Sequence, residues 1–302
     1  MDNLTHSLTG ALLGQCGLKR KTGLAMPALI IGANLPDVDA ACFFWLDGVE
    51  HLAFRRGITH GPPAWFLLPL VLAGLLYGFD RWQAKRGKRP ESRLPVNFAW
   101  LYILGLIGCL SHPALDWMNV YGIHLLEPFS SRWFYGDVLF IIDIWLWALL
   151  IFGVWFSLRR EKAGGAWQSP ARAAMAVMLA YIGLNAGITH ASERALAGQG
   201  DVVIASPPPV MFWQREMIVG GSGRYNVGGQ EVGLLTLTDA DKPVLAALEP
   251  RAAPFLFWSR TPLVRVAEDG TCTLTDARYM GRASGGFTVV LPDHACAPPP
   301  AE

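Results

Sequence analysis

Apolar residues gather in long runs over the first two thirds of the chain. Four of these runs approach the ~20 residues that a helix needs to cross a bilayer, and two shorter runs precede them. We interpret the first run as a retained short helix rather than a signal peptide, because no cleavage site follows it. The pattern predicts a polytopic membrane helical bundle over residues 1–195, with about six apolar segments at 8–18, 23–35, 62–79, 96–110, 138–158 and 171–191.

The pattern changes from about residue 200. Short alternating or β-branched runs, such as "VGLLTLTD" (232–239) and "GGFTVVLPD" (285–293), are separated by Gly, Pro and Asp. Such runs are typical of strands and turns. We therefore expect a mainly α protein whose residues 196–302 form a small β-rich domain outside the membrane.

Basic residues lie on one side of this predicted bundle. The loops 18–21, 80–93 and 158–172 follow the first, third and fifth apolar segments and are rich in Lys and Arg. Because such loops stay on the cytoplasmic side, the pattern predicts a multi-pass protein of a bacterial-type inner (plasma) membrane with an extracytoplasmic C-terminal domain. An oxidising exterior permits a bond between Cys272 and Cys296, although their spacing leaves both the bonded and the free state open.

Composition supports the membrane assignment and narrows the partners. Only 16% of the 302 residues are charged and 52% are hydrophobic, against roughly 25% charged in soluble domains. The net charge of +1 argues against a nucleic-acid partner, which requires a basic face. Membrane lipid is therefore the expected partner, and the sequence does not indicate an oligomeric state.

Histidines and aspartates gather at the predicted outer ends of the apolar segments, whereas the basic loops contain no histidine. Lys and Arg alone defined the two sides, so this clustering is an independent observation. A carboxylate at the edge of hydrocarbon is costly unless it is compensated, and a shared cation would compensate several at once. The candidate metal ligands are His6, Asp37, Asp39, His60, His112 and Asp116.

The spacing within "HPALD" is the most specific local signal. His112 and Asp116 are four residues apart, so both point along one face if the helix continues, although Pro113 would equally suit the start of a new helix. Such ligands suit Zn²⁺, as one ion or as a two-metal site. The cofactor expected is therefore a divalent metal, preferably Zn²⁺. The alternative is a local hydrogen-bonded pair that binds no metal.

Other candidates also carry two interpretations. His6 is either a ligand or an interfacial residue, and Asp37 is either a ligand or the cap of a following helix. We expect Asp39 to act as a general base or as a ligand of a second metal. Arg56 suits the binding of an anionic substrate through its fork of donors, or else its side chain extends to the lipid headgroups.

Three polar residues lie near this set. Asp143 is costly at its predicted depth unless it is paired, so it is expected to orient a ligand histidine. Asn119 is expected to have a structural role. His124 has no such neighbours in the predicted set and is expected to be a surface or interface residue.

Five motifs together resemble the YdjM-like family of inner-membrane, metal-dependent hydrolases. They are "LTHSLTG" (4–10), "LPDVD" (35–39), "RGITH" (56–60), "HPALDWMNVYG" (112–122) and "DVLFIID" (137–143). The resemblance covers roughly residues 1–160 and implies a helical membrane domain with a divalent metal. The order of His and Asp is also remotely similar to that of zinc-dependent phospholipase C. That likeness implies His6, Asp37, His60, His112 and Asp116 as ligands, but the second H-x-x-x-E pair of that enzyme is absent.

Two functions follow from these observations. The first is a metal-dependent hydrolase that cleaves an ester or phosphoester of a lipid or envelope substrate with metal-activated water, with Asp39 and Arg56 as catalytic residues. The alternative is a non-enzymatic membrane scaffold or envelope-stress protein whose C-terminal β domain binds a partner. A transporter is less favoured, because the acids gather on one face rather than at several depths.

Overall fold

The fold is mainly helical, with small antiparallel sheets in its C-terminal part, as the sequence predicts. The computed structural model describes residues 1–267, 269–280 and 287–296. The chain divides into two compact units. The helical unit comprises residues 1–39, 56–186 and 209–212, and the C-terminal unit comprises residues 40–55, 187–208 and 213–302. The single domain boundary expected near residue 195 stays a prediction.

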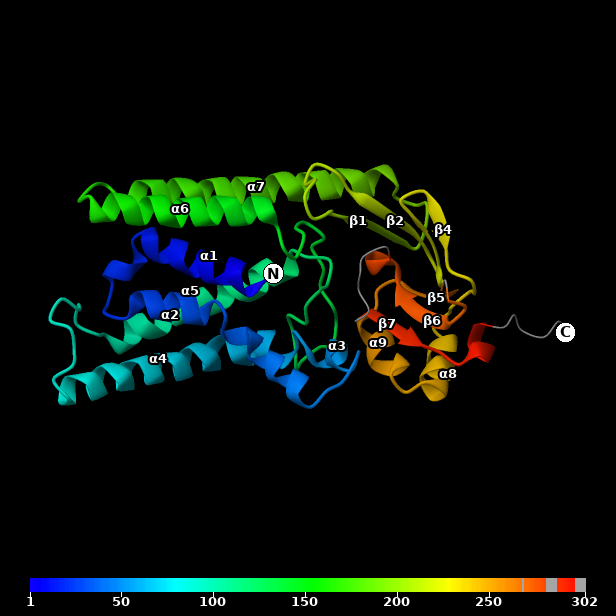
Figure 1. The fold of residues 1–302 in the computed structure, drawn as a ribbon, viewed down its shortest axis with the longest axis horizontal. Helices are drawn as coiled ribbons and strands as arrows, with labels where there is room; N and C mark the ends of the chain where they lie inside the picture. Colours follow the sequence, from blue (N-terminus) through cyan, green and yellow to red (C-terminus); the bar gives the residue numbers. More distant parts are fainter. Residues whose placement is uncertain (268, 281–286, 297–302) are drawn as a thin grey trace. The chain divides into compact units, whose positions relative to one another are not determined.

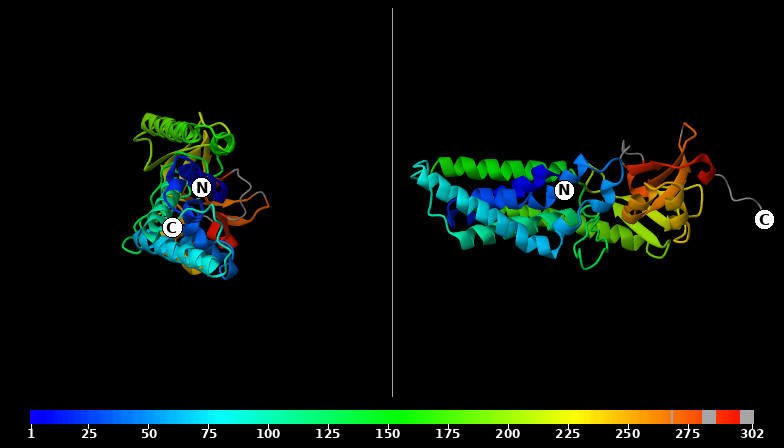
Figure 2. Two further views of the ribbon diagram at one scale, coloured as in Figure 1. Left: turned by 90° about the vertical axis from the view of Figure 1, so that its left-hand side faces the viewer. Right: turned by 90° about the horizontal axis from the view of Figure 1, so that it is seen from below.

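Helices account for most of the first 195 residues, and Figure 1 and the right-hand view of Figure 2 show the helices of the helical unit running roughly along one direction. Each of the six apolar runs contributes to a helix. The long elements are α1 (Asn3–Gln15), α2 (Ala25–Gly32), α4 (Pro62–Lys85), α5 (Phe98–Trp117), α6 (Ile144–Lys162) and α7 (Gln168–Ala195). Short elements join them: η1 (Leu18–Arg20), η2 (Leu35–Phe44), α3 (His51–Phe54) and η3 (Ile58–His60).

Polar residues fix where these helices begin. The Asp2 carboxylate accepts hydrogen bonds from the first backbone N–H groups of α1, and the Asn97 side chain does the same for α5. Asp143 caps α6 by accepting from the N–H of Leu146 at 2.9 Å and also accepts from the Tyr181 hydroxyl at 2.9 Å. The buried Asp143 carboxylate is therefore a helix cap. Its contacts are with Leu146 and Tyr181, and not with a ligand histidine as expected from the sequence.

Three helices in the described part of the chain, α4, α5 and α7, are long and apolar enough to cross a membrane. The pair α2 and η2, bent by 50°, passes the same test if it is taken as one span. Helix α6 carries Arg159, Arg160, Glu161 and Lys162 in its last turn. The structure therefore has three or four candidate spans, and the expected number of six crossings stays a prediction.

Glycines bring α1, α2 and α5 unusually close together. A side chain on Gly108 of α5 would lie 2.6 Å from the carbonyl oxygen of Leu29 in α2, and one on Gly10 of α1 would lie 2.7 Å from the same oxygen. A side chain on Gly32 would lie 2.7 Å from the Gly105 carbonyl oxygen. Small residues permit this approach of backbones in a membrane bundle. The C-terminal half of α2 is consequently packed backbone to backbone against α1 and α5.

The C-terminal unit contains two antiparallel sheets that share a core. One sheet has the order β1-β2-β3-β4 and the other β5-β6-β7, and side chains of Ile204, Ile218, Tyr225, Leu263 and Ala277 pack together between them. The elements are β1 (Val202–Ser206), β2 (Glu216–Gly221), β3 (Arg224–Val227), β4 (Gln230–Val232), α8 (Asp241–Leu248), α9 (Ala252–Trp258), β5 (Pro262–Val266), β6 (Cys272–Asp276), η4 (Ala277–Tyr279), β7 (Thr288–Val290) and η6 (Asp293–Cys296).

Two covalent or ionic links hold the second sheet. Cys272 and Cys296 form a disulfide, the bond that the sequence permits. Asp276 and Arg278 are fully buried and joined by an ion pair of 2.8 Å, and the guanidinium of Arg278 lies 4.7 Å from the Trp258 ring. The predicted run 285–293 contains β7, and its residues 285 and 286 lie outside the described part of the chain.

Candidate metal centre

Helix α5 supplies two of the predicted ligands on one face. The helix continues through Pro113 to Trp117, so His112 and Asp116 lie one turn apart, with the Nε2 atom of His112 3.6 Å from Oδ2 of Asp116. Both side chains are almost completely buried. The continuous helix, rather than a break at Pro113, is therefore what places the two donors together.

His6 of α1 joins this pair from another helix. Its ring stacks on that of His112, with 3.7 Å between the ring centroids. Its Nε2 atom lies 3.2 Å from Oδ1 of Asp116, and its Nδ1 atom has no hydrogen-bond partner among the residues that the structure describes. A buried imidazole nitrogen without a hydrogen-bond partner has a lone pair that can bind a cation.

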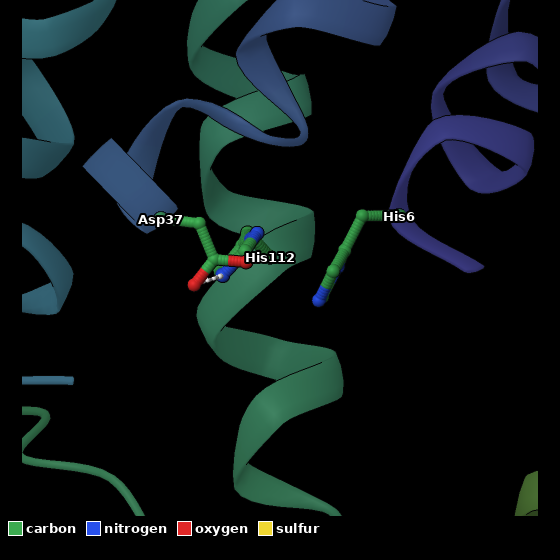
Figure 3. Close-up of side chains that lie close together, drawn as sticks. All are labelled: His6, Asp37 and His112. Carbon is green, nitrogen blue, oxygen red and sulfur yellow. Dashed lines mark ion pairs between the residues drawn. The ribbon is translucent and has the colours of Figure 1, made fainter. Parts of the chain in front are cut away.

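The two aspartates of "LPDVD" face different partners. Oδ1 of Asp37 lies 3.8 Å from Nε2 of His112, and Figure 3 shows Asp37 on one side of His112 and His6 on the other. Oδ2 of Asp39 instead accepts a hydrogen bond of 2.7 Å from the N–H of Arg56 and lies 3.6 Å from Nδ1 of His60. Asp37 and Asp39 are two residues apart in η2. Asp37 therefore faces His112, whereas Asp39 faces Arg56 and His60.

His60 completes the buried cluster. It lies in η3, its side chain is fully buried, and its Nε2 atom is 3.2 Å from Nε2 of His112 and 3.7 Å from Oδ2 of Asp116. Its Nδ1 atom is turned the other way, 3.0 Å from the Thr59 hydroxyl and near Asp39. The structure therefore gathers His6, Asp37, His60 and Asp116 around His112 and places Asp39 behind His60.

The hydrogen-bond partners of His60 and His112 determine which ring nitrogen is unprotonated and directs its lone pair to the centre. Nδ1 of His112 lies 2.7 Å from the carbonyl oxygen of Ala33, which only accepts, so this nitrogen carries the proton and Nε2 is unprotonated in the neutral ring. The Asp39 carboxylate, which also only accepts, lies 3.6 Å from Nδ1 of His60 and favours the same tautomer there. Two lone pairs then face each other at 3.2 Å, an arrangement that a cation between them stabilises.

Arg56 is part of the same buried network. Its Nε lies 2.9 Å from Oδ2 of Asp116, and its Nη1 donates to Oδ1 of Asn119 at 3.0 Å and to the carbonyl of Gly122 at 3.1 Å. Its backbone is in the left-handed region with φ 58°, which the bond to Asp39 fixes. Since only about 5% of Arg56 is exposed, the alternative in which it extends to lipid headgroups is wrong.

Several residues of the centre were not predicted from the sequence. Ala33 contributes only a backbone carbonyl, and the amino group of Met1 contacts Asp116. The Thr59 hydroxyl contacts His60. In the sequence, only its position next to that histidine could have indicated this contact. His124, expected to be a surface or interface residue, is buried, and its backbone N–H donates to the carbonyl of Arg56 at 3.0 Å. Burial lowers the pKa of His124 to about 4, so its ring is neutral near pH 7.

The ligand atoms form two overlapping groups, each of which could hold a metal ion. In each set the ligand atoms lie within 4.8 Å of one another, and both sets use His112. The sets are His6, Asp37 and His112, and His60, His112 and Asp116. Imidazole and carboxylate donors together suit Zn²⁺, and the unpartnered Nδ1 of His6 and the facing Nε2 atoms fit a cation. Asp37 is the most exposed ligand of the two sets, with 9% of its side chain accessible.

Comparison with known proteins covers the part of the chain that holds this centre. A family model described as "YdjM inner membrane protein" matches residues 1–191. The chain is also 24% identical over 167 residues to "Uncharacterized protein YfhP" of Bacillus subtilis (strain 168), covering 52% of this chain and 47% of that protein. It therefore spans about half the length of this relative. No solved structure matches the chain.

Proposed function

The chain belongs to the YdjM inner membrane protein family, and from this premise we propose that it is a membrane-bound, metal-dependent hydrolase. The single observation that carries the proposal is the pair of Nε2 atoms of His60 and His112, 3.2 Å apart beside the Asp116 carboxylate in a buried site. Imidazoles and carboxylates at this density are typical of a site that binds a divalent cation.

Each ligand has a defined task in this proposal. His6, Asp37, His60, His112 and Asp116 hold one or two divalent ions, preferably Zn²⁺. A divalent cation supplies Lewis acidity, which lowers the pKa of water in its coordination sphere and polarises an ester or phosphoryl oxygen. The accessible edge of Asp37 is the side from which substrate reaches the site.

Two residues support the ligands. Asp39 positions His60, since its carboxylate lies beside Nδ1 and leaves Nε2 directed at Asp116; a carboxylate behind a ligand histidine fixes the tautomer and orientation of the ring. This contact favours a positioning role for Asp39 over the general base predicted from the sequence. The contacts of Arg56 with Asp116 favour the same kind of role, while its predicted binding of an anionic substrate remains to be tested by substrate affinity.

The proposed substrate is an ester or phosphoester of a membrane lipid or envelope molecule. The apolar helices beside the centre support this choice, because a substrate in the bilayer is then present at high local concentration. The basic loops and the Cys272–Cys296 disulfide support an extracytoplasmic C-terminal domain, since disulfides persist in oxidising compartments. Cysteine-accessibility mapping of loops 80–93 and 196–201 from either side of the membrane tests this orientation.

The enzymatic test uses the full chain in vesicles of phosphatidylglycerol and phosphatidylethanolamine. We expect headgroup or phosphate release that is lost with a chelator and restored by Zn²⁺. The variant His60→Gln should be inactive, whereas His190→Gln, which changes an exposed histidine of α7, should retain activity. Equal release from wild type and His60→Gln would contradict the proposal.

A further inference from the structure

Residues 40–55 present a group of aromatic side chains on the surface of the C-terminal unit. We define the aromatic patch as Phe43, Phe44, Trp45 and Phe54. Phe44 is 91% exposed and Trp45 is 60% exposed, and the other two members are about half exposed. Large apolar side chains that gather on a surface mark a site of contact with a partner or a membrane.

Ring contacts hold three of the four side chains of the aromatic patch in place. The rings of Trp45 and Phe54 meet edge to face with centroids 6.1 Å apart, and the Phe43 ring lies 4.9 Å from that of His51. The guanidinium of Arg55 lies 5.3 Å from the Phe43 ring. Contacts within residues 40–55 therefore hold three of the four aromatic side chains of the patch.

The segment also has a buried side of its own. Cys42, Val49 and Leu52 are almost completely buried, and α3 packs against α9 within the C-terminal unit. The inward positions of the segment are thus already satisfied, and the outward aromatic positions are not needed to close its core. These outward side chains are therefore exposed and available for contact with a partner.

The composition of the patch and its position in the chain favour lipid as that partner. The patch begins at the end of η2, which with α2 passes the test for a bent membrane segment. Trp and other aromatic residues are favoured at the boundary of a bilayer, where the rings contact acyl chains and headgroups. The exposed Asp47 and Glu50, together with Arg55, supply polar groups beside the rings that suit the headgroup region.

We infer that the aromatic patch inserts into the interfacial layer of the bilayer and attaches the C-terminal unit to the membrane surface. The occupant of the patch is lipid, not a second copy of the chain or another protein. The inference concerns membrane attachment alone and is independent of any hydrolytic activity.

Site-directed spin labelling of the full chain tests this attachment directly. Cys16, Cys42 and Cys109, the cysteines outside the disulfide, are replaced by Ala, and a nitroxide is placed at Phe44→Cys in nanodiscs of phosphatidylglycerol and phosphatidylethanolamine. Leu75→Cys on the apolar face of α4 is the lipid control, and Asp239→Cys, with its side chain 95% exposed in the C-terminal unit, is the water control.

We expect the ratio of collision rates with oxygen and with a water-soluble nickel complex to be severalfold higher at position 44 than at position 239, and close to that at position 75. A ratio equal to that at position 239 would overturn the inference. Low accessibility to both reagents with spin–spin broadening would also overturn it, because a second copy would then cover the patch.

A second measurement needs no cysteine replacement. Brominated phosphatidylcholine quenches tryptophans that contact acyl chains, so the emission quenched in wild type should exceed that quenched in Trp45→Phe. The conservative change keeps an aromatic ring in the patch and leaves its packing intact. Equal quenching in the two proteins would contradict insertion, whatever the outcome for the labelled variants.

Discussion

The Nε2 atoms of His60 and His112 lie 3.2 Å apart, although the two residues are separated by 52 positions in the chain. On the opposite side of its ring, Nδ1–H of His112 donates a hydrogen bond to the Ala33 carbonyl oxygen, and Asp39 lies behind the ring of His60. Both rings thus direct a lone pair inward, towards the carboxylate of Asp116. We expect a cation, held with the help of these supporting residues, to account for this arrangement.

Asp39→Asn should weaken cation binding while the fold is retained. The amide can still accept the hydrogen bond from the N–H of Arg56, but the negative charge beside His60 is lost. Changes to such supporting carboxylates typically reduce metal affinity by about 10- to 100-fold. Titration of the metal-free protein with Zn²⁺ measures this change, with Asp47→Asn as the control at an exposed acid. Unchanged affinity in Asp39→Asn would remove the positioning role.

Arg56→Gln should destabilise the helical unit, and more so after chelation. The change leaves the buried Asp116 carboxylate without its guanidinium partner, and breaking a buried ion pair costs about 3 kcal/mol or more. A bound cation would compensate part of this loss. Thermal unfolding in detergent, with and without chelator, should therefore show a larger difference from wild type in the metal-free state. A difference that is independent of chelator would show that Asp116 and the cation do not interact.

Gly108→Leu should weaken both stability and metal binding. The new side chain would meet the Leu29 carbonyl and the Ala33 nitrogen, and such overpacking typically costs about 1–3 kcal/mol. Because α2 and α5 then move apart, Ala33 would no longer orient His112. Gly74→Leu in α4 is the matched control, since no atom lies within 4 Å of a side chain built there. Zn²⁺ affinity equal in the two variants would contradict this account of helix packing.

The C-terminal unit should lose stability in acid through Asp276. Burial alone would raise the pKa of this carboxyl, but the charge and hydrogen bonds of Arg278, with the Ser259 hydroxyl, lower the pKa to about 2. The pKa is therefore lower in the folded than in the unfolded chain, where it is about 3.9. This contribution to stability is complete above about pH 4 and is lost as the pH falls through about 2.

The acid transition provides the measurement for this pair. Near-ultraviolet circular dichroism of the full chain between pH 5 and pH 2 should show loss of the environment of Trp258, which stacks on Arg278. Asp276→Asn should destabilise the unit at neutral pH and weaken its dependence on pH in this window. Asp239→Asn, at an exposed acid, should behave as wild type. If Asp276→Asn and wild type unfold over the same pH range, this carboxyl is excluded as the source of the loss of stability in acid.

Local spacing predicted part of the candidate centre, and tertiary contacts supplied the rest. The interval of four residues predicted that His112 and Asp116 share one face of a helix. The basic loops predicted which helix ends lie on the same side of the membrane. No local pattern marks Ala33, because its contribution is a backbone carbonyl that reaches His112 only through the glycine contacts of α2 and α5. Similarly, the burial of His124 and Arg56 depends on how the loop after α5 folds back, which periodicity does not report.

Metal analysis of the purified full chain tests the central claim most directly. We predict at least one equivalent of a divalent cation, preferably Zn²⁺, in protein isolated without chelators, and a large loss of it in the double variant His112→Ala/Asp116→Ala. The exposed-site variant His190→Ala should keep the full content. A wild-type protein free of divalent metal, or a folded double variant with the same content as wild type, would contradict a metal centre.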